Sequence, residues 1–153
     1  MKFHSPVKIQ SLDQYHLVKV RAGSTISAAI TSDNEIIVWG SGEFGILQFP
    51  IKLVGNEDVK FVDIALCSSG KDAFGAAVDI DGFLYTLGDN QYGQLGLGDF
   101  NPRKIPSKVN QLRKKRINQV VCGSNYIIAL GKDVPEGYVK PAKRTNRRKD
   151  KPQ

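Results

Sequence analysis

The sequence is poor in the residues that most catalytic and metal sites require. It has two histidines, His4 and His16, and two cysteines, Cys67 and Cys122. Neither histidine stands at a motif spacing from a nucleophile or carboxylate, and the cysteines show no zinc-type Cys-x-x-Cys or Cys/His pattern. So few cysteines do not form a disulfide framework, which favours a reducing compartment. We therefore expect surface or packing roles for the histidines, buried hydrophobic positions for the cysteines, no metal or other cofactor, and no enzymatic activity.

Long apolar runs are also missing. No stretch approaches the roughly 20 apolar residues that a membrane helix needs. The chain opens with MKFHSP, which lacks the apolar segment of a secretory signal. These absences predict an intracellular protein, cytoplasmic or nuclear, with a cytoskeletal or other large assembly as an alternative setting and no membrane partner.

Positive charge is concentrated at the end of the chain. The net charge is +7, and residues 134–153 contribute seven Lys and Arg against two Asp and Glu. The other 133 residues carry 15 basic against 13 acidic side chains. After residue 134 there is too little apolar material to offset the entropy of ordering the chain. We predict a folded domain over residues 1–133 and a basic, extended or disordered tail over residues 134–153.

The chain repeats itself with a period of 48 residues. The stretch Phe83–Leu97 joins a short apolar run to a glycine-rich segment, and Ile36–Leu47 is a weaker copy of it. Gly40 in the weaker copy matches Gly88. A period of this length is typical of repeat architectures, in which each repeat is one structural unit.

The segments that connect these runs repeat as well. Pro6 precedes Gly23 by 17 residues, and Pro106 precedes Gly123 by the same number. A third copy, from Pro50 to Gly70, is three residues longer. The chain therefore holds two repeats and about half of a third.

Each repeat is expected to form four short strands. The pairs Asp33-Asn34 and Asp81-Gly82 separate β-capable runs, and Asp81-Gly82 predicts a hairpin with a primed turn. Only residues 109–115 are polar for long enough to form a helical turn between strands. Four antiparallel strands at a fixed period are typical of a propeller blade. The strands predicted for the middle repeat are Phe61–Leu66, Ala73–Asp79, Phe83–Gly88 and Lys104–Val109.

The segment Gly88–Asp99 reads GDNQYGQLGLGD and is followed by Pro106 and by Val121-Cys122-Gly123. This pattern resembles the repeat of the regulator of chromosome condensation family, and the resemblance covers Ser5–Gly131. It implies a β-propeller, which has seven blades in the founding member. We therefore predict an all-β fold, a partial β-propeller of about two and a half four-stranded antiparallel blades, with a disordered basic C-terminal tail.

Two local features have alternative interpretations. The glycine run Gly93–Gly98 ends at Asp99 rather than in Gly-Lys-Ser/Thr, so it predicts tight turns instead of a phosphate-binding loop. Large aromatic residues recur at matching positions of the repeats and have no basic residues interleaved, which predicts packing between blades rather than stacking with nucleic acid bases. These aromatic residues are Trp39, Phe44, Tyr85 and Tyr92.

An incomplete propeller leaves strand edges unpaired unless another chain covers them. We therefore predict a non-catalytic interaction or scaffold subunit, docking through loops, strand edges and the tail, with other chains completing or capping the propeller. Two alternatives stay open: a guanine nucleotide exchange factor for a small GTPase such as Ran, which the resemblance implies, and a chromatin or nucleic-acid-associated accessory protein. The tail is expected to bind an acidic protein surface or nucleic acid. The predicted contact residues are Arg113, Lys114, Lys115 and Arg116, the tail residues Arg144, Arg147, Arg148 and Lys149, and Asp99, Asn101 and Arg103 of the glycine-rich loop.

Overall fold

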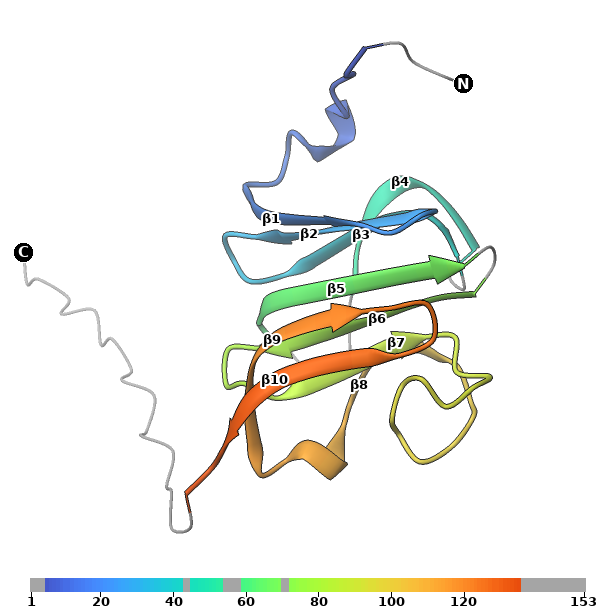
Figure 1. Ribbon diagram of the computed structural model, residues 1–153. Helices are drawn as coiled ribbons and strands as arrows, with labels where there is room; N and C mark the ends of the chain where they lie inside the picture. Colours follow the sequence, from blue (N-terminus) through green and yellow to red (C-terminus); the bar gives the residue numbers. More distant parts are fainter. Residues whose placement is uncertain (1–4, 43–44, 54–58, 70–71, 136–153) are drawn as a thin grey trace, which may run out of the picture.

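The computed structural model describes residues 5–42, 45–53, 59–69 and 72–135 of the chain, in which three antiparallel sheets follow one another (Figure 1). Blade 1 has the strand order β1-β2-β3-β4, blade 2 has the order β5-β6-β7-β8, and blade 3 consists of β9 and β10. The strands of blade 1 are β1 (Leu17–Ala22), β2 (Ile26–Thr31), β3 (Ile36–Gly42) and β4 (Gly45–Lys52). Those of blades 2 and 3 are β5 (Phe61–Ser69), β6 (Asp72–Asp79), β7 (Leu84–Gly88), β8 (Arg103–Lys108), β9 (Lys115–Cys122) and β10 (Ile127–Asp133).

This architecture confirms the predicted all-β partial propeller. The four strands expected in the middle repeat are present, with ends that differ by at most three residues from those predicted. The expected polar turn is the short 3-10 helix η2 (Asn110–Leu112), and an equivalent turn, η1 (Gln10–Leu12), precedes β1. Within the described residues no helix is long and apolar enough to cross a membrane. The predicted tail lies almost entirely outside the described residues.

The hairpin between β6 and β7 forms where Asp81-Gly82 predicted it, but the primed turn is wrong. A primed type I′ turn needs positive φ at both central residues. Here only Gly82 has positive φ, at 79°, and its N–H donates to the Asp79 carbonyl at 2.9 Å. The loop is thus a three-residue connection that ends in a left-handed residue. Asn34, with φ of 62°, ends the corresponding loop of blade 1.

Gly40 and Gly88 are required by backbone contacts between neighbouring strands. Their φ angles are 115° and 101°. A Cβ atom at Gly88 would lie 2.3 Å from the Ala73 carbonyl oxygen, and one at Gly40 would lie 2.3 Å from the Thr25 carbonyl oxygen. The repeated glycine thus lets the third strand of each blade bend close against the second.

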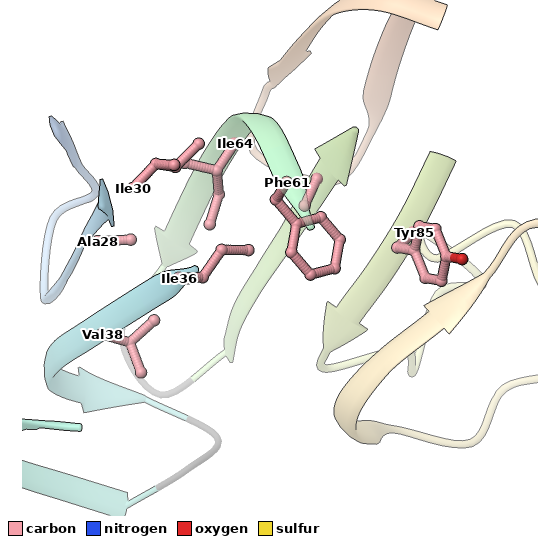
Figure 2. Packing of buried hydrophobic residues seen from close by; sticks show 8 residues of the cluster. Ala28, Ile30, Ile36, Val38, Phe61, Ile64 and Tyr85 are labelled. Carbon is pink, nitrogen blue, oxygen red and sulfur yellow. The ribbon is translucent and has the colours of Figure 1, made fainter. Parts of the chain in front are cut away.

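The hydrophobic core lies between the blades. Figure 2 shows aliphatic side chains of blade 1, among them Ile30 and Ile36, facing Ile64 and Phe61 of blade 2. A second cluster joins blade 2 to Ile117 and Val120 of blade 3. Burying one such aliphatic side chain contributes roughly 1.5–3 kcal/mol. The second cluster also contains Ala65, Ala76, Val78, Leu84 and Val109.

The aromatic residues differ in how deeply they are buried. Tyr85 is buried and meets Phe61 edge to face, with ring centroids 5.5 Å apart, so its predicted packing role is confirmed. The same prediction is wrong for Tyr92, which is 65% exposed because it lies in the loop that follows β7 rather than in a strand. Trp39 is half-buried, and Phe44 lies outside the described residues.

Candidate interaction surfaces

A carboxylate links the inner strands of all three blades. Asp63 on β5 accepts hydrogen bonds from Lys19 Nζ at 2.9 Å and Arg21 Nη2 at 3.3 Å, both on β1. Its second oxygen accepts the Val120 backbone N–H of β9 at 3.4 Å. The Asp63 side chain is only 9% exposed. This contact fixes the three blades relative to one another, and its sequence signal is an acidic residue inside an apolar strand.

A hollow of about 600 Å³ opens beside this carboxylate. Residues of β1, β5 and β9 line it together with Leu130 of β10, so it lies mainly along the inner strands, where a closed propeller has its central channel. Within the described part of the chain, no group of three His, Cys, Asp or Glu could hold a metal ion. The charged and polar lining residues are Lys19, Arg21, Asp63, Asn118 and Gln119.

Both cysteines are free and only half-buried, so they are less buried than the sequence predicted. Burial raises the pKa of the Cys122 thiol to about 12, and the neighbouring Cys67 adds to this rise. The thiol of Cys122 is therefore protonated at neutral pH, which makes it a poor nucleophile. His16 is exposed, and His4 lies outside the described residues.

The glycine-rich loop, residues 89–102, is held together by two buried amides, Asn90 and Gln94; Gln94 donates to Asp89 Oδ2 at 2.7 Å and accepts the Tyr92 N–H at 3.0 Å. Asn90 is 0% exposed, and its Nδ2 donates to the Asp99 carbonyl at 2.8 Å and the Asn101 carbonyl at 3.1 Å. Its Oδ1 accepts the Leu95 N–H at 3.0 Å. The loop therefore has a defined conformation without a strand of its own.

The structure brings together the three predicted contact residues of this loop. Arg103 donates to Asp99 Oδ2 at 2.6 Å, and Asp99 Oδ1 accepts the Asn101 N–H at 2.8 Å. These hydrogen bonds, with that from Arg103 the strongest, lower the pKa of the Asp99 carboxyl. Much of the hydrogen-bonding capacity of Asp99, Asn101 and Arg103 is thus used within the loop.

The most exposed side chains of the loop are aromatic. Tyr92 is 65% exposed and Phe100 is 71% exposed. Phe100 leans over the backbone of Gly93, where a Cβ would lie 3.4 Å from its ring. Reasoning from the sequence missed Phe100 as a contact candidate, although a large apolar residue between Asp99 and Asn101 is a recognisable signal.

The structure divides the predicted basic cluster in two. Arg113 and Lys114 are exposed. Lys115 instead pairs with Asp133 at 2.6 Å, and the Arg116 guanidinium lies 4.4 Å from the centre of the Phe83 ring. Only the first two residues of the cluster are thus mainly solvent-facing. Arg144, Arg147, Arg148 and Lys149 lie outside the described residues.

Apolar side chains are exposed at both ends of the blade stack. We call Ile9 and Val20, at the blade 1 end, the leading face; they are 44% and 62% exposed. We call Val121, Ile128 and Leu130, at the blade 3 end, the trailing face; they are 46%, 57% and 59% exposed. Figure 1 places β1 and β10 at opposite ends of the stack. Isolated exposed apolar residues are common, but residues clustered on one face mark interaction sites.

Two four-stranded blades, half of a third and a core between them define a section of a β-propeller repeat protein. The family model of the regulator of chromosome condensation (RCC1) repeat matches residues 81–130. Human E3 ubiquitin-protein ligase HERC2 is 38% identical over 126 residues, which are 77% of this chain and 3% of HERC2. The Arabidopsis thaliana ultraviolet-B receptor UVR8 is 31% identical over 137 residues, 84% of this chain and 30% of UVR8. Residues 81–130 therefore form an RCC1 repeat, as the sequence motifs predicted.

Solved structures agree with this fold. Prp20p from Saccharomyces cerevisiae superimposes with a TM-score of 0.67 at 19% identity, over 81% of this chain and 33% of Prp20p. Human WBSCR16 gives a TM-score of 0.65 at 20% identity, over 79% of this chain and 33% of WBSCR16. The chain thus spans a third or less of these relatives.

Proposed function

We propose that this chain is a non-catalytic protein–protein interaction module that serves as a scaffold within a larger assembly. The observation that carries this proposal is the pair Tyr92 and Phe100, two exposed aromatic side chains on a loop that the buried Asn90 fixes. Aromatic residues supply much of the binding energy at protein interfaces. A loop already held in one conformation loses little entropy when it binds.

The chemistry of the described residues supports a binding role rather than catalysis. The buried Asp63 is engaged by two cations and a backbone N–H, and the half-buried Cys122 thiol is protonated at neutral pH. HERC2 and HERC4 are named as ligases, but this chain covers only 3% and 13% of them. We assign the repeats the task of docking, with other protein chains as partners.

The test is a double substitution of the loop aromatics. The Tyr92→Ala/Phe100→Ala variant and a Gln91→Ala control, which alters an exposed polar residue of the same loop, are purified from cells with their partners and compared by quantitative mass spectrometry. We expect at least one partner to fall about tenfold or more with the double variant and to be retained by the control. Full retention of every partner by the double variant would contradict the proposed role of the loop.

A guanine nucleotide exchange factor for a small GTPase such as Ran is the second candidate. The crystal structure of Prp20p is described together with its binding to Gsp1p and histones. At 19% identity over a third of Prp20p, this likeness supports the fold alone. Release of a fluorescent guanine nucleotide from the GTPase, measured with the purified chain, distinguishes the two candidates, because an interaction module leaves the rate at its intrinsic value.

The basic tail offers a third docking element, for an acidic protein surface or for nucleic acid in a chromatin-associated role. Binding of the tail to nucleic acid would weaken steeply with salt, because each neutralised phosphate releases counterions. Comparing the full chain with one lacking residues 140–153, at 50 and 200 mM salt, tests this role. Nucleic acid affinity that is equal for both chains would exclude the tail as the binding element.

A further inference from the structure

The leading and trailing faces correspond to the two sides of the interface between neighbouring blades. This interface occurs twice within the chain, between blades 1 and 2 and between blades 2 and 3. We propose that the trailing face of one copy binds the leading face of a second copy, head to tail. This inference rests on the proposed role as an interaction module and names one partner, a second copy of the same chain. Equivalent positions in the three blades have different exposures.

The trailing face corresponds to residues that blade 2 buries. In blade 3 the pairing runs Ile128 with Val121 and Leu130 with Gln119, followed by a register shift. In blade 2 the same pattern is Ala76 with Ala65 and Val78 with Asp63, followed by the same shift. Ala65, Ala76 and Val78 are 7%, 0% and 0% exposed because the first strand of blade 3 covers them. Their equivalents Val121, Ile128 and Leu130 are about half exposed, since no following blade lies over them in the described structure.

On the leading face, an exposed residue corresponds to residues that blades 2 and 3 bury against the preceding blade. Val20 occupies the register position of Ile64 in β5 and of Val120 in β9. Ile64 is 0% exposed and packs on blade 1, and Val120 is 3% exposed and packs on blade 2. Val20, at 62% exposed, is the same kind of residue at the same position without a blade to pack on.

The connection before β1 supports the same assignment. In η1 the Leu12 N–H donates to the Ile9 carbonyl at 3.1 Å, and in η2 the Leu112 N–H donates to the Val109 carbonyl at 3.1 Å. Ile9 and Val109 are therefore equivalent. Val109 is 5% exposed within the core between blades 2 and 3, whereas Ile9 is 44% exposed.

The charges of the two faces are compatible. At one inner-strand position blade 1 has Lys19, blade 2 has Asp63 and blade 3 has Gln119. Lys19 and Asp63 pair across the boundary between blades 1 and 2 at 2.9 Å. Head-to-tail docking would bring Gln119 of one copy to Lys19 of the next, where a neutral amide oxygen can accept from an ammonium group. No like charges meet at this position.

Side-chain size predicts that the association is reversible. The trailing face has valine, isoleucine and leucine where blade 2 has two alanines and a valine. These larger side chains present more apolar area but prevent the close approach that the alanines allow inside the chain. Such a head-to-tail interface forms a ring if its rotation closes and a filament if it does not. Each copy contributes three blade positions, the third being the half-blade of β9 and β10. Because propellers close at about four to eight blades, we expect a ring of two copies.

Sedimentation velocity on the full chain from about 1 to 100 µM tests this proposal. We expect a concentration-dependent shift from monomer to dimer. Val20→Asp on the leading face and Ile128→Asp on the trailing face should each weaken self-association by at least about 100-fold, because each places a charge in an apolar contact. Ile80→Asp, which alters an exposed apolar residue at the β6–β7 hairpin, is the matched control and should associate as the wild type does.

Mixing the two face variants gives the sharpest result. The Val20→Asp chain keeps an intact trailing face, and the Ile128→Asp chain keeps an intact leading face. We expect their equimolar mixture to form a one-to-one dimer and nothing larger, with circular dichroism showing that both variants are folded. A wild-type chain that stays monomeric at 100 µM, or a mixture that stays monomeric while the wild type associates, would overturn the proposal.

Two further outcomes separate this inference from the proposed function. A monomeric chain that binds an added propeller fragment of a different protein overturns pairing with a second copy but leaves the interaction role intact. Head-to-tail association in a chain whose Tyr92→Ala/Phe100→Ala variant retains every partner contradicts the loop proposal and supports this one.

Discussion

Replacing Asp63 by alanine should destabilise the chain more than the loss of a surface ion pair does. Breaking a fully buried ion pair by removing one partner costs about 3–5 kcal/mol. The two cations here, Lys19 and Arg21, are 34% and 44% exposed and keep part of their hydration, so the full value is not reached. The Val120 N–H also loses its acceptor, which costs about 1–3 kcal/mol for a buried donor. We expect a total loss of about 2–4 kcal/mol in the free energy of unfolding.

Urea unfolding followed by the fluorescence of Trp39, the single tryptophan, measures this loss. All chains carry Ile128→Asp, so that self-association does not contribute to the apparent stability. Asp133→Ala is the matched control, because Asp133 also pairs with a lysine but its side chain is 78% exposed; its cost should stay below about 1 kcal/mol. Asp63→Asn keeps an oxygen acceptor and should fall between the control and Asp63→Ala.

An equal loss in the free energy of unfolding for Asp63→Ala and Asp133→Ala would refute a special role of the buried carboxylate. Such a result would mean that the contact across three blades contributes no more than an exposed pair. A lowered urea slope in Asp63→Ala alone would have a different meaning. It would indicate that the blades unfold separately once the carboxylate is absent, because the slope scales with the surface exposed in one transition.

Three further predictions concern the loop, the strands and the thiols. Gly88→Ala should lower the free energy of unfolding by more than about 3 kcal/mol, because φ is positive there and the new Cβ would lie 2.3 Å from a carbonyl oxygen. Gly96→Ala, whose Cβ would meet nothing within 4 Å, should lower it by only about 1–2 kcal/mol. Thermal melts measure both losses, and equal losses would refute the steric argument. The lowered pKa of Asp99 means that its carboxylate stabilises the loop at neutral pH and that this contribution is lost as pH falls below the usual value of 3.8. The protection of the Asn101 amide, measured as its hydrogen-exchange rate relative to the unprotected rate at the same pH, should therefore decrease there, and unchanged protection would contradict the hydrogen bond. At pH 8, Cys122 should react with iodoacetamide at least tenfold more slowly in the native chain than in urea, by mass spectrometry, and equal rates would exclude its burial.

The sequence predicted the parts of the fold that depend on local backbone geometry. The glycine at the end of the third strand recurs because a side chain there would collide with the second strand, and this requirement appears in both four-stranded repeats as the same residue. The hairpin loops contain Asp33-Asn34 and Asp81-Gly82 for a similar reason, because the last residue of each loop has positive φ. The turn type was wrong because the number of residues in the loop depends on which strand residues pair, and pairing is not visible in a dipeptide.

The interaction surfaces were harder to predict because they depend on neighbours far away in the chain. Lys115 and Arg116 belong to one basic run in the sequence, yet their partners Asp133 and Phe83 come from other strands. The role of Asp63 depends on two other blades, 42 to 57 residues away. Tyr92 was assigned to the core by analogy with other aromatic residues, although it lies past the last residue of its strand.

The position of the core between blades, rather than within them, has an evolutionary consequence. A blade without a core of its own cannot be inherited as an independent domain, but it can be copied. Duplicating one 48-residue unit adds a strand set that brings both halves of the interface with it, so the new junction is already compatible with its neighbours. Cutting the chain inside a blade removes one half of an interface, whereas cutting it between blades exposes two matching halves. Changes in repeat number are therefore better tolerated than insertions of arbitrary length within the inner strands.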